Sequence, residues 1–289
     1  MPSNEFHLVD VFATERYAGN QLAVVEDPAS LTDEEMQALA AEFGFSETTF
    51  VSLTRGTGDA FHTRIFTPRE EIPFAGHPTL GTAWVVRDRT GVEDVTLDLP
   101  VGEIPVDSRS TDGTETLWMR QRTPTFGARR SHEDAAAVLG LPVDSLDHDR
   151  PVQEVSTGLP TVVVPLRDRA ALTDVDVDRA AYDSFVAERD AKNVLAFCPD
   201  PRNPENDLAC RVFAPYYDVP EDPATGSSNG CLAAYLARHR DDGDVSVRVE
   251  QGYEMGRPSL LFLDAHDAGE TVTVEVGGRV VPVGSGTLR

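Results

Sequence analysis

Two segments of the chain combine glycine, proline and polar side chains in a pattern that could hold an anion and move a proton. Residues 71–86 read EIPFAGHPTLGTAWVV, and residues 221–236 read EDPATGSSNGCLAAYL. Both open with Glu-x-Pro-x-x-Gly and continue into small apolar residues. Gly76 and Gly226 are 150 positions apart (226 − 76). This repetition predicts two walls of one site.

A different polar residue follows each of these glycines, His77 in the first segment and Ser227 in the second. The apolar residues that come next predict helices over 78–89 and 228–240, and proline suits the first turn of the former. The free N–H groups and positive dipole at a helix N-terminus form an anion site. We therefore expect the two helix ends to hold a carboxylate between them. Two ordinary glycine turns that lead into helices would show the same pattern.

Two titratable residues of these segments are candidates for proton transfer. A histidine at the positive end of a helix should have a lowered pKa, so His77 is expected to be a neutral imidazole that relays protons. A purely structural histidine is the alternative. Asp222 precedes Pro223 and could point towards the same helix ends. An Asp-Pro turn would explain it equally well.

Glu47 is the candidate general base. It lies in FGFSETTFV (43–51), after a helix cap and ahead of a strand. Phe45 and Phe50 flank it, which predicts partial desolvation and a raised carboxyl pKa suited to proton transfer near neutral pH. A solvated turn residue is the alternative in a chain with 49 acidic residues.

The elements around these residues predict an α+β fold. Capping boxes and glycine stops predict helices over 36–43 and 135–139, and residues 178–190 form a further helical segment. Short apolar or alternating runs predict strands at 6–12, 22–26, 49–54, 61–68, 95–100, 115–120, 161–166, 193–198, 209–215, 245–252, 259–264 and 271–276. Strand clusters interrupted by single helices are typical of α+β proteins.

The repeat extends beyond the glycine motifs. RIFTP (64–68) matches RVFAP (211–215), and AGNQLAVV (18–25) resembles TGLPTVVV (157–164). We therefore predict two homologous lobes, residues 1–122 and 123–274, with the active site in the cleft between them.

Composition limits the classes of partner. Asp plus Glu number 49 against 25 Lys plus Arg, a net charge of −24, so nucleic acid and anionic membranes are poor partners. The acid is dispersed and Lys192 is the only lysine, a composition typical of a halophilic protein from a salt-saturated cytoplasm. No signal-peptide pattern is seen at the N-terminus, so a cytoplasmic protein is expected.

Cysteine spacing and the missing motifs exclude several chemistries. Cys198, Cys210 and Cys231 lack CxxC spacing, so neither a disulfide framework nor a zinc site is favoured. No HExxH, GxSxG, P-loop or GxGxxG-after-strand pattern occurs. The sequence therefore predicts no metal site and argues against hydrolase, nucleotide and dinucleotide functions.

Several blocks together resemble the phenazine-biosynthesis PhzF-like isomerases, in the diaminopimelate-epimerase-like superfamily. The matching blocks are SETTFV, PFAGHPTLGTAW, VSTGLPTVVVPL, EDPATGSSNGCLAAYL and QGYEMGRPS, in this order over essentially the whole chain. The resemblance implies two pseudo-twofold related lobes, each a curved, mostly antiparallel sheet around a central helix. It also implies that the last strand, 275–289, completes the N-terminal lobe, that the active site uses no cofactor, and that the protein is a homodimer.

The resemblance also implies roles for single residues. The family's proton-transferring glutamate falls on Glu47, its histidine on His77, its aspartate on Asp222 and its serine on Ser227. The asparagine of its GNP-like motif falls on Asn20, although glutamine replaces the usual proline after it.

The superfamily's racemases and epimerases use two thiols as acid and base. Those thiols would stand just before the two motif glycines, where this chain has Ala75 and Thr225. Racemisation by two thiols is therefore not expected.

These observations lead to one hypothesis and two alternatives. We expect a cofactor-independent isomerase that moves a proton between carbons of a small unsaturated carboxylate, with Glu47 as general acid and base. A non-catalytic protein that binds aromatic acids or other small metabolites in the same cleft is the alternative from another class. A thiol-free epimerase is the third possibility.

Overall fold

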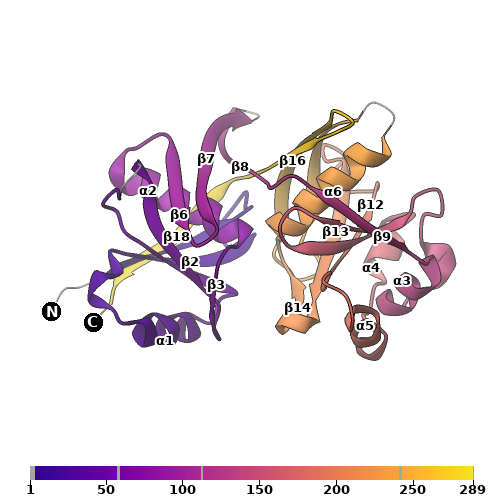
Figure 1. Cartoon of the computed structure of the whole chain (residues 1–289), viewed down its shortest axis with the longest axis horizontal. Helices are drawn as coiled ribbons and strands as arrows, with labels where there is room; N and C mark the ends of the chain where they lie inside the picture. The colour runs from indigo at the N-terminus through magenta and orange to yellow at the C-terminus, as the bar shows by residue number, and fades with distance from the viewer. Residues whose placement is uncertain (1–3, 57–58, 112, 241–242, 289) are drawn as a thin grey trace. The chain divides into compact units, whose positions relative to one another are not determined.

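The chain divides into two compact units. A computed structural model describes residues 4–56, 59–111, 113–240 and 243–288. Unit 1 comprises Met1–Arg120 and Gly277–Arg289, and unit 2 comprises Gln121–Val276. The chain thus passes from unit 1 to unit 2 after Arg120 and returns at Gly277 (Figure 1).

Unit 1 is built on one continuous set of paired strands. Its strands are β1 (Glu5–Val11), β2 (Asn20–Glu26), β3 (Glu47–Val51), β4 (Phe61–Phe66), β5 (Glu71–Ile72), β6 (Val95–Leu99), β7 (Gly102–Thr111), β8 (Thr114–Arg120) and β18 (Val280–Thr287). The order is β18–β1–β2–β3–β4–β6–β7–β8, and β5 pairs with the end of β4. The pairs β2–β3 and β4–β6 are parallel and the others are antiparallel. Figure 1 shows the C-terminal β18 in yellow among the indigo strands of this unit.

Unit 2 repeats this topology. Its strands are β9 (Thr125–Arg130), β10 (Val152–Ser156), β11 (Pro160–Pro165), β12 (Asn193–Cys198), β13 (Leu208–Ala214), β14 (Val219–Asp222), β15 (Asp244–Gln251) and β16 (Ser259–Asp267), and β17 (Val272–Gly278) leads back to unit 1. The order is β9–β10–β11–β12–β13–β15–β16, with β14 on the end of β13. The pairs β11–β12 and β13–β15 are again the parallel ones.

The repeat predicted from short sequence matches is therefore a repeat of strand order and direction. In each unit two strands that pair in parallel are followed by an antiparallel strand, a short strand of two to four residues and a long helix, in the same order along the chain. The α+β fold with two lobes of mostly antiparallel strands is confirmed.

A buried helix packs within the strands of each unit. Helix α2 (Gly76–Thr90) contacts β1, β2, β3, β6, β7, β8 and β18, and α6 (Gly226–His239) contacts β10, β11, β12, β15 and β16. Gly81 lets α2 approach the strands closely, because a Cβ there would lie 2.5 Å from Leu22 Cδ2 and 2.8 Å from Val11 Cγ2. Close packing of this kind fixes the helix ends relative to the strands.

The remaining helices cover the outer faces. Helix α1 (Asp33–Phe43) has the predicted capping box at Thr32 and glycine stop at Gly44, and α3 (His132–Leu139) has a serine cap and a glycine stop. The helix expected over 178–190 is shorter, α5 (Arg179–Val186), and a five-residue helix α4 (Arg169–Thr173) was not expected. Across the described ranges, no helix is both long and apolar enough to cross a membrane.

Five strands were not predicted, namely β5, β7, β9, β10 and β14, and β18 was expected only as part of a last strand over 275–289. Three of these six contain a proline, Pro105 in β7, Pro220 in β14 and Pro282 in β18. Proline is tolerated in a sheet at edges and bulges, and the pairing register of β1 and β18 shifts between Leu8 and Val9, where Val9 pairs with Pro282. Most side chains of β7 are also exposed, so the strand lacks the alternation of apolar and polar residues by which a strand is predicted.

The net charge leads to a prediction about salt. We expect the thermal midpoint of unfolding to rise from low salt to molar KCl, because the −24 charge repels itself over a Debye length of ~30 Å at 0.01 M. Thermal melts across a KCl series measure this. A midpoint that is flat or falls with salt would remove the halophile interpretation.

Candidate active site in two half-sites

Both glycine motifs lie inside the first turn of a helix rather than ahead of it. The sequence predicted helix starts at Pro78 and Ser228, but α2 begins at Gly76 and α6 at Gly226. The reason is that the preceding residue, at 75 and at 225, has an extended backbone and forms the N-cap. His77 and Ser227 are therefore second residues of their helices. The N–H groups of the first turn are those an anion can use.

In unit 1 the structure brings Glu47 and His77 together. Glu47 is the first residue of β3, not a turn residue ahead of it as the sequence suggested. Its Oε2 lies 3.4 Å from His77 Nε2, and the two side chains are 17% and 6% exposed. The separation exceeds that of a charge-assisted hydrogen bond. The carboxylate and the imidazole thus face each other at the start of α2.

The imidazole of His77 is buried and neutral. Burial lowers its pKa to about 3, and a hydrogen bond to the Gln21 backbone opposes that shift. This bond stabilises the protonated form, so a ring N–H donates to the Gln21 carbonyl. Because Nε2 makes no hydrogen bond, the donor is Nδ1. The lone pair of Nε2 therefore faces the Glu47 carboxyl group and can accept a hydrogen bond from its protonated form.

The surroundings of Glu47 differ from those the sequence suggested. Side chains alternate along a strand, and Thr49, two residues on, bonds to Thr82 of α2 at 2.7 Å. Phe50 points to the other face, where it packs with residues of α1. Phe45 stacks on Phe43 of α1. The N-terminal turn of α2, rather than a pair of phenylalanines, therefore encloses the carboxyl group.

Asn20 begins β2 and is 2% exposed. The Gly19 turn before it is tight, with a φ of +65° and a position for Cβ 2.3 Å from Val11 O, so only glycine fits. Because Gln21 holds the His77 ring, Asn20 is one residue from the histidine contact. The structure thus places three predicted residues of unit 1 on adjoining elements: Asn20, Glu47 and His77.

In unit 2 the structure gathers Asp222, Gly226 and Ser227 around the start of α6. Asp222 ends β14, and its carboxylate accepts a hydrogen bond from the Thr225 hydroxyl. Ser227 is 9% exposed, and its carbonyl accepts a bond of 3.4 Å from Thr157. The Asp-Pro turn thus brings the carboxylate to the helix cap.

Sequence reasoning missed two amides behind this cap, Gln251 and Asn229. Gln251 is the last residue of β15 and is 1% exposed. Its side chain bonds the backbone of Asp222 and Thr225, and Asn229 Nδ2 donates to Gln251 Oε1 at 2.8 Å. Local pattern gave no signal for Gln251, because polar residues recur along β15.

The repeat places Asn193 where unit 1 has Glu47. Each is the first residue of its strand, and in the parallel pairs Leu22 aligns with Glu47 while Thr161 aligns with Asn193. Asn193 is 2% exposed and donates to Ser228 Oγ at 3.1 Å. The strand position that carries a carboxylate in unit 1 therefore carries a neutral amide in unit 2.

None of the three cysteines stands at a motif glycine, although Cys210 Sγ contacts Asn229 Oδ1 and Gln251 Oε1 at 3.7 Å each. All are buried, and desolvation raises the pKa of each thiol, that of Cys198 to about 11. Nucleophilic or basic thiols need the opposite shift.

We expect turnover close to wild type after replacement of Cys198, Cys210 and Cys231 by alanine, with any loss confined to stability. Turnover after exhaustive thiol alkylation of the wild type is the second measurement. Loss of turnover in a folded alanine variant would restore a thiol mechanism.

The lowered pKa of His77 predicts a pH-dependent stability. The unfolded state has the ordinary pKa of about 6.5 and the folded state about 3, so between these values the unfolded chain binds more protons. The contribution is fully present above pH 6.5 and is lost as the pH falls towards 3. From pH 7.5 to pH 5 it should fall by about 2 kcal/mol.

His77→Asn, which can still donate to the Gln21 carbonyl, should remove this part of the pH dependence. Denaturation of wild type and variant at both pH values measures the difference, and the same substitution at the exposed His62 controls for the loss of a titratable side chain. Parallel stability curves for wild type and His77→Asn would contradict the neutral buried imidazole.

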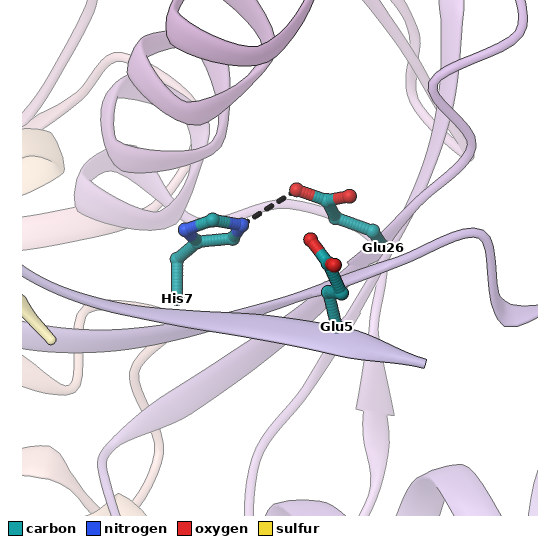
Figure 2. A group of neighbouring side chains, drawn as sticks. All are labelled: Glu5, His7 and Glu26. Carbon is teal, nitrogen blue, oxygen red and sulfur yellow. Dashed lines mark hydrogen bonds and ion pairs between the residues drawn. The ribbon is translucent and has the colours of Figure 1, made fainter. Parts of the chain in front are cut away.

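One cluster of possible metal ligands occurs in the described part of the chain, and it is held by ion pairs. Figure 2 shows Glu5, His7 and Glu26, with His7 Nε2 2.5 Å from Glu26 Oε1. The Arg89 guanidinium also contacts Glu26 at 2.7 Å and Glu5 at 2.8 Å. The guanidinium supplies the positive charge between these carboxylates, so we assign the cluster to the structure of unit 1.

Comparison with known proteins identifies the family of the chain. Residues 9–286 match the family model described as phenazine biosynthesis-like protein. The chain is 37% identical to the trans-2,3-dihydro-3-hydroxyanthranilate isomerase of Pseudomonas aeruginosa, over 95% of each chain. It superposes on a Bacillus anthracis PhzF-family protein with a TM-score of 0.89 and 27% identity, over all of both chains.

A more distant neighbour shares the fold alone. A hydroxyproline epimerase from Agrobacterium vitis matches with a TM-score of 0.61 and 11% identity, over 99% of this chain and 92% of the epimerase. The fold of the two units is thus common to PhzF proteins and to epimerases of this type. The chain belongs to the family of phenazine biosynthesis-like PhzF proteins, and it is an isomerase.

Proposed function

We propose that the chain is a cofactor-independent isomerase that moves a proton between carbons of a small unsaturated carboxylate. Glu47 removes the proton from one carbon and returns it to another carbon of the conjugated system. His77 assists by accepting a hydrogen bond through Nε2 from the protonated Glu47 carboxyl group. Asp222 and Ser227 orient the substrate, and the first turns of α2 and α6 bind its carboxylate.

The observation that carries this proposal is the contact between Glu47 and His77. A carboxyl group and a neutral imidazole lone pair face each other 3.4 Å apart, both largely withdrawn from water. A proton taken up by Glu47 has an acceptor beside it, which is the arrangement that general acid–base catalysis requires. The amide at Asn193 gives unit 2 no equivalent strand carboxylate. Proton transfer by one carboxylate in unit 1 is therefore favoured over a symmetric pair.

The name of the Pseudomonas aeruginosa relative supplies the first substrate to test. The chain should be incubated in D₂O with trans-2,3-dihydro-3-hydroxyanthranilate, and then with a pool of cellular metabolites. We expect an isomer that carries one deuterium, formed only when the protein is present. A shifted double bond identifies a proton shift, whereas deuterium at an inverted but otherwise unchanged carbon identifies an epimerase.

The same incubation tests the binding-protein alternative. A ligand that binds tightly and is recovered unchanged, without deuterium, would overturn the acid–base proposal for that ligand class. Glu47→Gln run in parallel separates enzymatic exchange from spontaneous exchange in solution.

A further inference from the structure

We infer that Gln251 and Thr225 are positioning residues that fix the Asp222 carboxylate for catalysis. This inference rests on the proposed function for the role of Asp222 in turnover. The hydrogen bonds on which it depends lie wholly within unit 2 and are independent of any substrate.

The orientation of the Gln251 amide is determined by its partners. Its Nε2 donates to the Asp222 carbonyl at 2.7 Å, and its Oε1 accepts from the Thr225 N–H at 3.2 Å. If the amide were inverted, its NH2 group would face the Thr225 N–H and its oxygen would face the Asp222 carbonyl, so neither hydrogen bond could form. The side chain therefore joins the end of β14 to the N-cap of α6 in one orientation.

This orientation sets the direction of the Thr225 hydroxyl. Gln251 Nε2 also lies 3.1 Å from Thr225 Oγ1 and donates to it. The hydroxyl hydrogen is then left for the Asp222 Oδ2, with which Thr225 makes its other hydrogen bond. The relay runs from the Gln251 amide through the Thr225 hydroxyl to the carboxylate. It holds one carboxylate oxygen and so fixes the direction of the other.

Burial makes the relay rigid. Gln251 is 1% exposed and Asn229, which donates to Gln251 Oε1, is fully buried. A buried amide whose donors and acceptor are both used has no alternative partner in water. The cap of α6 therefore keeps a single arrangement in which Asp222 is half-buried and Thr225 faces it.

The first test needs no substrate. Three-bond couplings in protein labelled at aspartate report the side-chain rotamer of Asp222. We expect one rotamer in the wild type and in Thr225→Ser, which keeps the hydroxyl. Thr225→Val, which has the same shape without the hydroxyl, should average between rotamers, and so should Gln251→Met. Thr63→Val removes a buried hydroxyl in unit 1 that bonds only a local carbonyl, and it is the control.

The second test uses turnover. Thr225→Val should lower kcat about 10- to 100-fold, the loss that corresponds to one hydrogen bond to a charged group, with a smaller change in KM. In an Asp222→Ala background the same substitution should cost little more, because Thr225 acts through the carboxylate. Thr225→Ser should restore most of kcat.

The outcomes separate the two proposals. An Asp222 rotamer that stays fixed in folded Thr225→Val and Gln251→Met overturns the positioning role. Equal losses of kcat with and without Asp222 overturn it as well. A wild type without turnover or exchange on any probe contradicts the proposed function, whereas averaged rotamers in the variants would still support the relay.

Discussion

Glu47→Gln should lower the rate of isomerisation by about 10²- to 10⁴-fold, the contribution typical of a general acid–base group. The amide keeps the shape of the side chain and can donate to the His77 Nε2 lone pair, so folding and ligand binding should survive. It has no basic oxygen that could accept a carbon-bound proton at neutral pH. His77→Asn and Asp222→Asn should lower the rate by smaller factors, since they remove assistance rather than the base.

The decisive measurement is exchange of a bound substrate or analogue with D₂O, for the wild type and Glu47→Gln. Glu154→Gln is the matched control, because Glu154 has a nearly equal side-chain exposure of 18% but contacts Arg130 and Arg189 instead of the site. Equal exchange rates in wild type and a folded, ligand-binding Glu47→Gln would show that another group is the base.

The repeated motifs explain why so much of this arrangement could be predicted. The spacing of Gly76 and Gly226 and the recurrence of strand, loop and helix indicated two related units, and the strand pairings show the same order in both. The contact of Glu47 with His77 joins residues 30 positions apart (77 − 47) on different elements. Resemblance to a family suggested that pairing, whereas local pattern gave each residue only separately.

What could not be predicted depends on contacts across the sheet. The two phenylalanines near Glu47 were expected to desolvate it because they are neighbours in sequence. Phe50 in the strand and Phe45 ahead of it both lie on the side of α1, and the first turn of α2 provides the burial. Gln251 gave no signal as a site residue, because its partners lie 26 and 29 positions away along the chain. Tertiary contacts of this kind are not encoded in periodicity.

The repeat also carries a pair of ion pairs that differ in burial. Arg64 makes a two-bond contact with Glu71 in unit 1, and Arg211 makes the same contact with Glu221 in unit 2. In unit 1 the side chains are 22% and 34% exposed, and Arg64 has a second partner in Asp33 at 2.6 Å. In unit 2 they are 10% and 16% exposed. The same arginine–glutamate ion pair is thus partly exposed in unit 1 and largely buried in unit 2.

Glu221→Gln should therefore destabilise the protein by about 3 kcal/mol, because it leaves the Arg211 guanidinium as a buried charge without its carboxylate. The carbonyls of Leu172 and Val175 still accept hydrogen bonds from Arg211, which holds the cost to the lower end of the range for broken buried pairs.

Glu71→Gln, the matched control, should cost about 1 kcal/mol or less, since Arg64 is partly solvated and keeps Asp33. Chemical denaturation of the two variants side by side measures the difference between their free energies of unfolding. Molar salt should change this difference little, because the ion pair in unit 2 is shielded from dissolved ions. Glu221 is also the residue before Asp222, so its loss should loosen the end of β14 and lower turnover at temperatures where the protein is still folded. Equal destabilisation by the two substitutions would mean that burial of the arginine does not set the strength of the repeated ion pair.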